Sequence, residues 1–272
     1  MLSEELENKL NNLKNFLADK KIIVAFSGGV DSSLLAFLSK KFGKNTLLVT
    51  EQSILYPDEE IEFTKNFSKT YNIEHILIHR NPLENSEFTA NPKNRCYICK
   101  ISLYNGIKEI LEKKDFDIIV DGSNMDDLDD FRPGMKALEE LDISLPYIKY
   151  NITKSDIRNL SKYFGLKVYS KPSMACFVSR IPYNEIINQE KIERIKKAEK
   201  FLKKKYNLFQ LRVRHHKNKL ARIELLSKEF STILNEKDLK IINKKLKDLG
   251  FNYVTLDLEG FRSGSLNLSL TR

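Results

Sequence analysis

The sequence predicts an α/β fold built on a doubly wound parallel sheet, and three features of its 272 residues support this prediction. The first two-thirds of the chain alternates apolar runs with segments whose apolar residues recur at helical spacing. The apolar runs are continuous, which is typical of strands buried on both faces of a parallel sheet. A Gly-Gly turn, Gly28 and Gly29, follows the first run directly and opens a helical segment.

The expected elements follow one another in a regular order. An amphipathic helix with one leucine face leads into a buried strand over 21–26 (the leucines are Leu6, Leu10, Leu13 and Leu17). We then expect a helix over 31–42, a strand over 45–50, a helix over 59–71 and a strand over 74–79. After the breaker-rich stretch 89–94 come a helix carrying Ile101, Tyr104, Ile107 and Leu111, a strand over 116–122, and a helix begun by a Thr153–Asp156 capping box.

The composition changes near residue 185, so we expect two domains, 1–185 and 186–272. The second is expected to be a small α/β domain with basic helices near 189–206 and 236–249 and strands at 209–215, 220–225 and 251–258. Residues 186–272 carry 21 of the 46 Lys and Arg residues but only 10 of the 37 Asp and Glu residues. Such a basic domain suits nucleic acid or a small phosphorylated ligand. The segment lacks interleaved aromatic residues, so we favour the small ligand over RNA.

Membrane insertion and secretion are both disfavoured by the sequence. The longest strongly apolar run, Ile22–Phe26, is far shorter than the about 20 residues that a membrane-spanning helix needs. The first ten residues are acidic and lack the apolar region of a signal peptide. Three cysteines in a long, lysine-rich chain do not form a disulfide framework. We expect a cytoplasmic homo-oligomer whose thiols are reduced unless they hold a metal.

The segment SGGVDSS, Ser27–Ser33, has the features of a phosphate-binding loop. Glycines allow a tight turn and close approach of the backbone to a phosphate, and the following helix directs its N–H groups at the anion. The Gly-Lys-Ser/Thr ending of a Walker A loop is missing, so pyrophosphate as a leaving group fits better than transfer of the γ-phosphoryl group. Asp31 is expected to help hold Mg²⁺, and Ser32 and Ser33 to donate hydrogen bonds.

On these residues the chain resembles the PP-loop ATP pyrophosphatase superfamily, whose members adenylate a carbonyl or carboxyl oxygen. DGSNMDD, Asp121–Asp127, resembles the second strand-end loop of that fold. The resemblance implies an ATP site that includes Ala25, Phe26, Ser27, Gly28, Gly29, Asp31, Ser32, Ser33, Thr50 and Gly122.

The cysteines are spaced for a metal site that is one ligand short. Cys96 and Cys99 fall at the start of an expected helix, where they share a face and the positive helix end favours thiolate. Cys176 is the third cysteine. Three thiolates on a [4Fe–4S] cluster would leave one iron able to hold an exogenous sulfide. A Cys₃His zinc site is the less favoured alternative, with His75, His79, His215 and His216 as possible ligands.

The second half sharpens the resemblance to a single family. Four stretches, 129–138, 175–183, 211–225 and 253–264, together resemble the LarE family of sulfur transferases, which act in nickel-pincer nucleotide cofactor biosynthesis. The resemblance implies a pyridinium mononucleotide substrate whose carboxylates become thiocarboxylates. One branch of that family sacrifices the sulfur of a single cysteine, which corresponds to Cys176. The additional Cys96 and Cys99 place this chain with the three-cysteine branch.

Side chains that bind the substrate phosphate are expected on both sides of the domain boundary near residue 185. Arg212 and Arg214 alternate along a strand, so both lie on one face, opposite Leu211 and Val213. Two neighbouring guanidinium groups suit a phosphate. The resemblance assigns them this role together with Ser179 and Arg180. It also implies a catalytic set of Cys176, Asp31, Glu224 and Arg262, in which the individual roles of Glu224 and Arg262 stay open.

The expected reaction has two steps. A substrate carboxylate attacks the α-phosphorus of ATP and releases pyrophosphate, and sulfide carried on the cluster or on Cys176 then replaces AMP. The alternatives are a tRNA 2-thiolation enzyme with the same loop and cluster, an ATP-dependent amidating synthetase, and a non-enzymatic carrier of metal or cluster gated by nucleotide. The tRNA enzyme would bind RNA. The synthetase would not require the three cysteines, and the carrier would bind ATP without releasing pyrophosphate.

Overall fold

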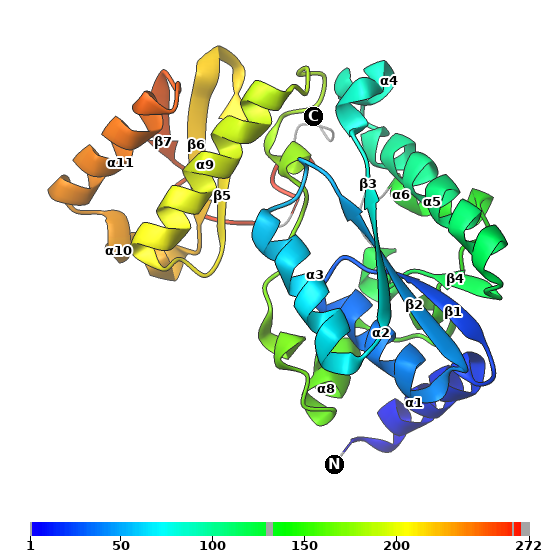
Figure 1. The fold of residues 1–272 in the computed structure, drawn as a ribbon. Helices are drawn as coiled ribbons and strands as arrows, with labels where there is room; N and C mark the ends of the chain where they lie inside the picture. Colours follow the sequence, from blue (N-terminus) through cyan, green and yellow to red (C-terminus); the bar gives the residue numbers. More distant parts are fainter. Residues whose placement is uncertain (1, 129–132, 263, 268–272) are drawn as a thin grey trace. The chain divides into compact units, whose positions relative to one another are not determined.

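The computed structural model describes residues 2–128, 133–262 and 264–267 (Figure 1). Its contacts divide the chain into two compact units. The N-terminal unit comprises Met1–Asn81 and Asn94–Met174, and the C-terminal unit comprises Pro82–Lys93 and Ala175–Arg272. The boundary at residue 185 stays a prediction; in the structure, residues 175–185 group with the C-terminal unit, as does the inserted stretch 82–93.

The N-terminal unit is built on a four-stranded parallel sheet, which confirms the predicted fold class. Its strands lie in the order β3-β2-β1-β4, with bounds Lys21–Ala25 (β1), Asn45–Gln52 (β2), Glu74–His79 (β3) and Ile118–Val120 (β4). The chain winds outward from β1 to β2 and β3, and then returns to place β4 on the other side of β1. The carboxyl ends of β1 and β4 therefore form the switch point at which such sheets bind ligands.

Helices cover both faces of this sheet (Figure 1). One face packs against α1 (Glu4–Leu17), α2 (Val30–Phe42), α3 (Asp58–Tyr71), α7 (Pro146–Lys149) and α8 (Lys154–Tyr163). The other packs against α5 (Arg95–Lys114) and α6 (Gly134–Glu140). The predicted leucine face of α1 is buried throughout, and the predicted capping box of α8 is present.

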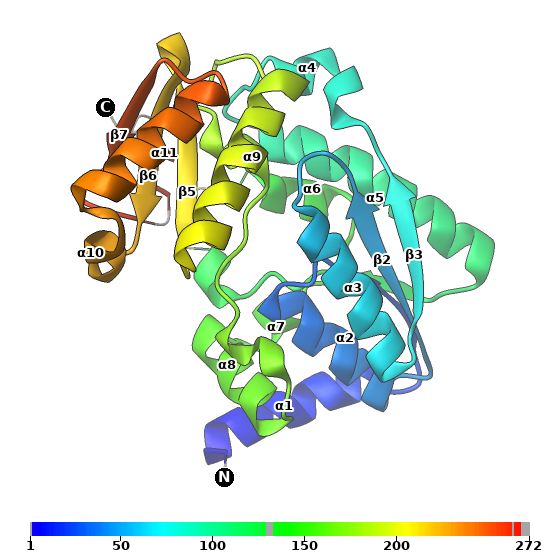
Figure 2. The same cartoon turned by 60° about the vertical axis from the view of Figure 1, so that its left-hand side comes forward.

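The C-terminal unit contains a three-stranded sheet of order β5-β6-β7. Its strands are Leu211–His216 (β5), Leu220–Leu225 (β6) and Tyr253–Leu256 (β7), and β6 pairs antiparallel with β5 and parallel with β7. The long helices α9 (Gln189–Tyr206) and α11 (Glu236–Asp248) pack on this sheet through a common apolar core (Figure 2). Short helices complete the unit at Ser86–Thr89 (α4) and Phe230–Ile233 (α10).

The inserted stretch is tied to the C-terminal unit by its own hydrogen bonds. The buried Asn91 side chain donates to the carbonyls of Pro182 (2.7 Å) and Glu185 (2.8 Å), and the Ile187 N–H donates to the Thr89 carbonyl. Across the described ranges, no helix is both long and apolar enough to cross a membrane. The cytoplasmic location and the homo-oligomeric state that we expect stay predictions.

Candidate functional site

The loop Ser27–Ser33 lies at the switch point, between the end of β1 and the start of α2. Gly29 is the N-cap residue of α2, so the helix begins with no capping side chain and its first N–H groups face the loop. The Ser32 hydroxyl closes the loop: it lies 3.2 Å from the Ser27 hydroxyl, and it donates to the Gly29 carbonyl at 3.3 Å. The Ser33 side chain is fully buried beneath the loop. The geometry is that of a backbone-lined anion site.

Glycine is required at two points of this site by close contacts. Gly28 has φ +73°, and a Cβ there would lie 2.9 Å from the Phe63 ring. A Cβ on Gly122 would lie 3.0 Å from the backbone nitrogen of Ser32. The second contact places the loop after β4 directly against the phosphate loop. The two strand-end loops are therefore in direct contact.

Asp31 is held by partners from both neighbouring loops. The Lys154 ammonium donates to Asp31 Oδ1 at 2.6 Å, and the Asn124 amide donates to the same oxygen at 3.4 Å. The Lys154 backbone N–H in turn donates to Asp126 at 2.7 Å. Burial raises the pKa of Asp31, Lys154 lowers it, and the nearby Asp127 raises it, with a net result above the usual range.

Lys154 was not identified from the sequence. It lies 123 residues from Asp31, at the first position of α8, where the capping box fixes its backbone. The only sequence signal was a lysine inside a capping box. A second lysine was missed in the same way, since Lys171 donates to the Gly28 carbonyl (2.9 Å) and pairs with Glu60 (2.7 Å). The cationic groups absent from the loop itself are thus supplied by distant segments.

Thr50 lies beside the first strand end. Its buried hydroxyl donates to the Phe26 carbonyl at 2.6 Å and lies 2.8 Å from His75 Nε2. Burial lowers the pKa of His75 to about 4, with Lys65 adding to the effect, so the ring is neutral at pH 7. Thr50 therefore fixes the backbone where β1 enters the loop. A contact of Thr50 with ATP stays a prediction.

Cys96 and Cys99 lie in the first turns of α5, as the sequence predicts, and Cys96 is exposed. Lys100 of the same helix pairs with Asp121 (3.4 Å), which directly follows β4. Tyr104, one turn further on, also donates to Asp121. Burial raises the pKa of Asp121, but Lys100 and the hydrogen bonds from Ser123 and Tyr104 outweigh it, so the pKa lies below its usual range. The two thiols therefore stand on a helix anchored to the same sheet edge as the phosphate loop.

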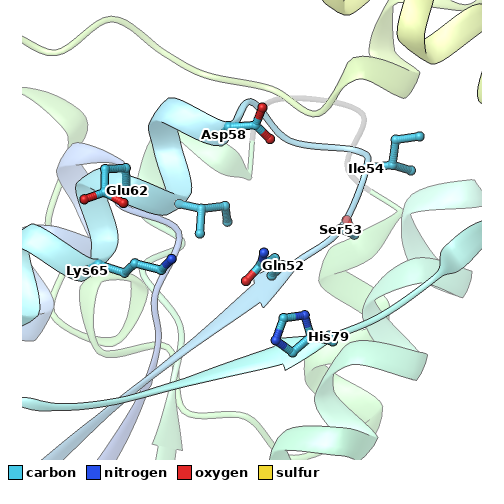
Figure 3. A pocket seen from close by; sticks show the side chains of 8 residues that line it. Gln52, Ser53, Ile54, Asp58, Glu62, Lys65 and His79 are labelled. Atoms are coloured by element: carbon cyan, nitrogen blue, oxygen red, sulfur yellow. The ribbon is translucent and has the colours of Figure 1, made fainter.

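A pocket of about 510 Å³ opens at the carboxyl ends of β2 and β3, beside α3 (Figure 3). Its lining is polar and of mixed charge: Gln52, Ser53, Ile54, Asp58, Ile61, Glu62, Lys65 and His79. None of the residues expected to bind ATP lines it.

Cys176 lies at the start of the C-terminal unit, where it caps the short 3₁₀ helix Phe177–Arg180. Phe177 and Val178 are buried and anchor this turn. Arg180 is fully buried, and its guanidinium group makes a bidentate ion pair with Glu199 of α9, with both N–O distances 2.9 Å. The same group donates to the carbonyls of Ala175 (2.6 Å) and Cys176 (3.0 Å).

Arg212 and Arg214 both lie on β5, and the two residues are 3% and 5% exposed. Arg214 donates twice to Glu224 of β6, and also to the Ser179 carbonyl (2.7 Å) and the Ser265 hydroxyl (2.9 Å). They therefore do not form a solvated strand face. Burial lowers the pKa of Arg212 to about 10, and the positive charges of Arg180 and Arg214 add to the effect.

Arg180, Arg212 and Arg214 form what we call the arginine cluster, and Glu224 and Arg262 extend it. Glu224 is fully buried and also pairs with Arg222 (3.0 Å), which reaches Asp257 (2.9 Å). Arg262 pairs with Asp257 at 3.5 Å. Arg222, Asp257, Glu199 and Ser265 were not identified from the sequence. Glu224 lies between the apolar Ile223 and Leu225, an alternation typical of a half-exposed strand, so nothing in the sequence signals its burial.

The predicted metal ligands are divided between the two units. Within the described ranges, no group of three or more His, Cys, Asp and Glu side chains could hold a metal ion. Cys96 and Cys99 belong to one unit and Cys176 to the other, and none of the three forms a disulfide. His215, with a pKa lowered to about 4 mainly by burial, bonds Arg194 at 2.8 Å. The three-cysteine set and its zinc alternative stay predictions.

Comparison with known proteins identifies relatives along nearly the whole chain. The chain is 38% identical over 270 residues to an uncharacterized protein of Synechocystis, covering 98% of this chain and all of that protein. It is 32% identical over 257 residues to pyridinium-3,5-bisthiocarboxylic acid mononucleotide synthase of Lactiplantibacillus plantarum, covering 93% of this chain and 91% of that enzyme. A glutamine-hydrolyzing GMP synthase of Thermotoga petrophila is 23% identical over 182 residues, which cover 61% of this chain and 36% of that enzyme. No family model matches the chain.

Proposed function

The chain belongs to the LarE family of sulfur transferases, and on that premise we propose that it adenylates a carboxylate of a pyridinium-3,5-dicarboxylate mononucleotide and converts it to a thiocarboxylate. One observation carries this proposal. The phosphate loop and the helix that bears Cys96 and Cys99 share one edge of one sheet, and the Lys100–Asp121 ion pair joins the helix to that edge. An adenylating site and a sulfur-handling group are thereby built into the same unit.

In the first step the loop binds ATP. Its N–H groups and the start of α2 suit the phosphates, and Asp31 would hold Mg²⁺, which would supply positive charge to them. The Lys154 ammonium, which pairs with Asp31, would then be shared between that carboxylate and the polyphosphate. The substrate carboxylate forms a bond to the α-phosphorus while the bond to the β-phosphate oxygen breaks. The electron pair leaves with pyrophosphate, and an acyl-adenylate remains.

The substrate's own phosphate is assigned to the arginine cluster. Arg212 is the best-suited group, since the nearby positive charges of Arg180 and Arg214 would be offset by a bound dianion. The Ser179 hydroxyl, which donates to the Cys176 carbonyl in the structure, would be a further donor on exchanging that bond for the phosphate. Glu224 accepts two hydrogen bonds from Arg214 and orients it, so the role of Glu224 is to position Arg214 and not to take part in the reaction. Arg262 stands at the end of the same ion-pair chain through Asp257 and Arg222.

In the second step sulfide forms a bond to the acyl carbon, and AMP departs with the electron pair of the cleaved C–O bond. The proposed ligands of a [4Fe–4S] cluster are Cys96, Cys99 and Cys176. Cys96 and Cys99 suit such a group, because they share a face at the positive end of α5, where thiolate is stabilised. When bound, a cluster with three protein thiolates would supply an iron able to carry sulfide.

The test of the adenylation step is pyrophosphate release by the purified full chain. ATP, Mg²⁺ and the dicarboxylate mononucleotide should give pyrophosphate and AMP, with little of either when the mononucleotide is omitted. Formation of ADP and phosphate would contradict the proposal. ATP binding without turnover would favour the carrier. Salt-sensitive binding of tRNA with thiolation of the tRNA would instead identify the tRNA enzyme.

The cysteines are tested by anaerobic reconstitution with iron and sulfide. Each of Cys96→Ala, Cys99→Ala and Cys176→Ala should greatly weaken cluster binding, seen as loss of the broad visible absorption, because two thiolates seldom hold a stable cubane. With added sulfide the intact protein should turn over more than once per chain. The contrary result is dehydroalanine at position 176 in iron-free protein, with Cys96→Ala and Cys99→Ala retaining a single turnover.

A further inference from the structure

The fully buried Arg180 has no surface to offer a ligand. All three of its guanidinium nitrogens donate to oxygens of the protein: Nε and Nη2 to the Glu199 carboxylate, and Nη1 to the carbonyls of Ala175 and Cys176 and to the Ser179 hydroxyl. A buried charge is held most firmly when its partner and its hydrogen bonds are complete. A substrate phosphate could reach this guanidinium only if these bonds broke.

The Cys176 carbonyl is held by three donors. Arg180 Nη1 lies 3.0 Å from it, the Ser179 hydroxyl 2.8 Å, and the Ser179 backbone N–H 3.1 Å. The peptide that follows Cys176 is therefore fixed in one orientation, and with it the direction of the cysteine side chain. Phe177 and Val178, buried in the same turn, prevent the segment from shifting.

Glu199 connects this turn to β5, the strand that carries Arg212 and Arg214. Its Oε1 accepts from Arg180 Nε and from the Val213 backbone N–H, both at 2.9 Å. On the same strand, Arg214 donates to the Ser179 carbonyl at 2.7 Å. The segment 175–180 is thus bound twice to β5, once through the Arg180–Glu199 pair and once through Arg214.

We propose that Arg180 is a positioning residue, which together with Glu199 holds the backbone of Cys176 and the hydroxyl of Ser179 in register with the arginines of β5. This assignment differs from the phosphate-binding role that family resemblance implies for Arg180. It deepens the proposed function and rests on the sulfur-handling role given there to Cys176. Arg180 acts through the main chain of the turn and does not touch substrate.

The two roles of Arg180 lead to opposite expectations for Glu199→Gln. If Arg180 binds phosphate, weakening its internal partner frees the guanidinium, and substrate binding is kept or tightened. If Arg180 positions Cys176, the same change loosens the turn, and sulfur transfer falls while substrate binding stays. Arg180→Lys should have the same effect as Glu199→Gln in the positioning role, because an ammonium cannot reproduce the bidentate pair. The matched control is Glu190→Gln, on the same helix, where the carboxylate is 69% exposed.

The first measurement does not depend on enzymatic activity. In a Cys96→Ala, Cys99→Ala background Cys176 is the only thiol of the chain, so its rate of alkylation by iodoacetamide can be measured at one fixed pH. Arg180→Lys and Glu199→Gln should each change that rate, and Glu190→Gln should leave it unchanged. Circular dichroism identifies any variant that fails to fold, and Glu199→Gln, which keeps the side-chain shape, serves if Arg180→Lys does not fold.

The second measurement uses the three-cysteine protein. For Arg180→Lys and Glu199→Gln, kcat of sulfur transfer should fall about tenfold to hundredfold, the size expected for a displaced reacting group, with the Kd of the dicarboxylate mononucleotide unchanged. A weakened Kd with an unaltered alkylation rate of Cys176 would overturn the proposal and restore Arg180 as a ligand. If the parent protein transfers no sulfur but the alkylation rate still changes in the variants, the proposed function fails and the positioning role stands.

Discussion

The phosphate loop and the arginine cluster are both proposed sites for anions, but they are built in different ways. The loop uses backbone N–H groups at a helix start, together with two glycines that admit close approach. The arginine cluster uses buried side chains, and two of them, Arg180 and Arg214, are held by carboxylates from other segments. A backbone site depends on a short stretch of sequence, whereas a side-chain site depends on partners that the fold brings together. A substitution in the phosphate loop should therefore affect only that loop. A substitution in the arginine cluster should also affect the segments that hold its side chains.

The largest effect is expected at Asp31. Asp31→Ala should abolish pyrophosphate release, because the metal ligand is lost while the backbone of the loop is unchanged. The thermal unfolding midpoint should stay near that of the parent, since Asp31 is on the loop-to-helix turn. Asp58→Ala is the matched control, because Asp58 lies at the same sheet edge but lines the separate pocket beside α3. Equal loss in both variants would show that the whole edge, and not the loop, is required.

Arg212 provides the corresponding test of the arginine cluster. Arg212→Met should weaken binding of the dicarboxylate mononucleotide by about 1.5 to 3 kcal/mol, the value of a charge-assisted hydrogen bond, and leave ATP affinity near the parent's. Isothermal titration with each ligand measures both. Arg214→Met should in addition lower the free energy of unfolding, since it leaves the buried Glu224 with fewer partners. Loss of ATP binding with substrate binding intact would reverse the assignment of the two sites.

Lys154 gives a smaller effect that depends on pH. Lys154 lowers the pKa of Asp31, so Lys154→Met should raise that pKa further above its usual range. Because Mg²⁺ needs the ionised carboxylate, the acid side of the pyrophosphate-release profile should move to higher pH. Lys149→Met, at the neighbouring α7, controls for loss of a positive charge. An unmoved acid limb in Lys154→Met would show that Asp31 is not the group that titrates.

The smallest effect concerns the stability of the C-terminal unit. His215 has a folded pKa of about 4, below its usual value of 6.5, so the unfolded chain takes up a proton first as the pH falls. The contribution of His215 to the free energy of unfolding is therefore present above pH 6.5 and declines between pH 6.5 and about 4. His215→Gln should make urea unfolding less dependent on pH across this window. If the free energy of unfolding of His215→Gln depends on pH as steeply as that of the parent, the acid sensitivity comes from other groups.

The difference between the sites also explains what the sequence could predict. The sheet, the phosphate loop and the start of α5 follow from local patterns, and all three were found. Lys154, Lys171 and Glu199 could not be found in this way, because each acts on a residue brought near only by folding. Arg212 and Arg214 were correctly placed on one face, but their burial depends on Glu224 of the adjacent strand. A local sequence pattern can locate a site built from backbone groups, but it does not identify the partners in a site built from side chains.

The most direct test of the proposed function is to identify the product. The purified protein would be incubated without oxygen with ATP, Mg²⁺, sulfide and the dicarboxylate mononucleotide, and the products analysed by mass spectrometry. We expect a mononucleotide in which carboxylate oxygen is replaced by sulfur, in an amount matching the pyrophosphate released. Pyrophosphate release without sulfur in the product, or an amide formed when ammonia replaces sulfide, would contradict a sulfur-transfer function.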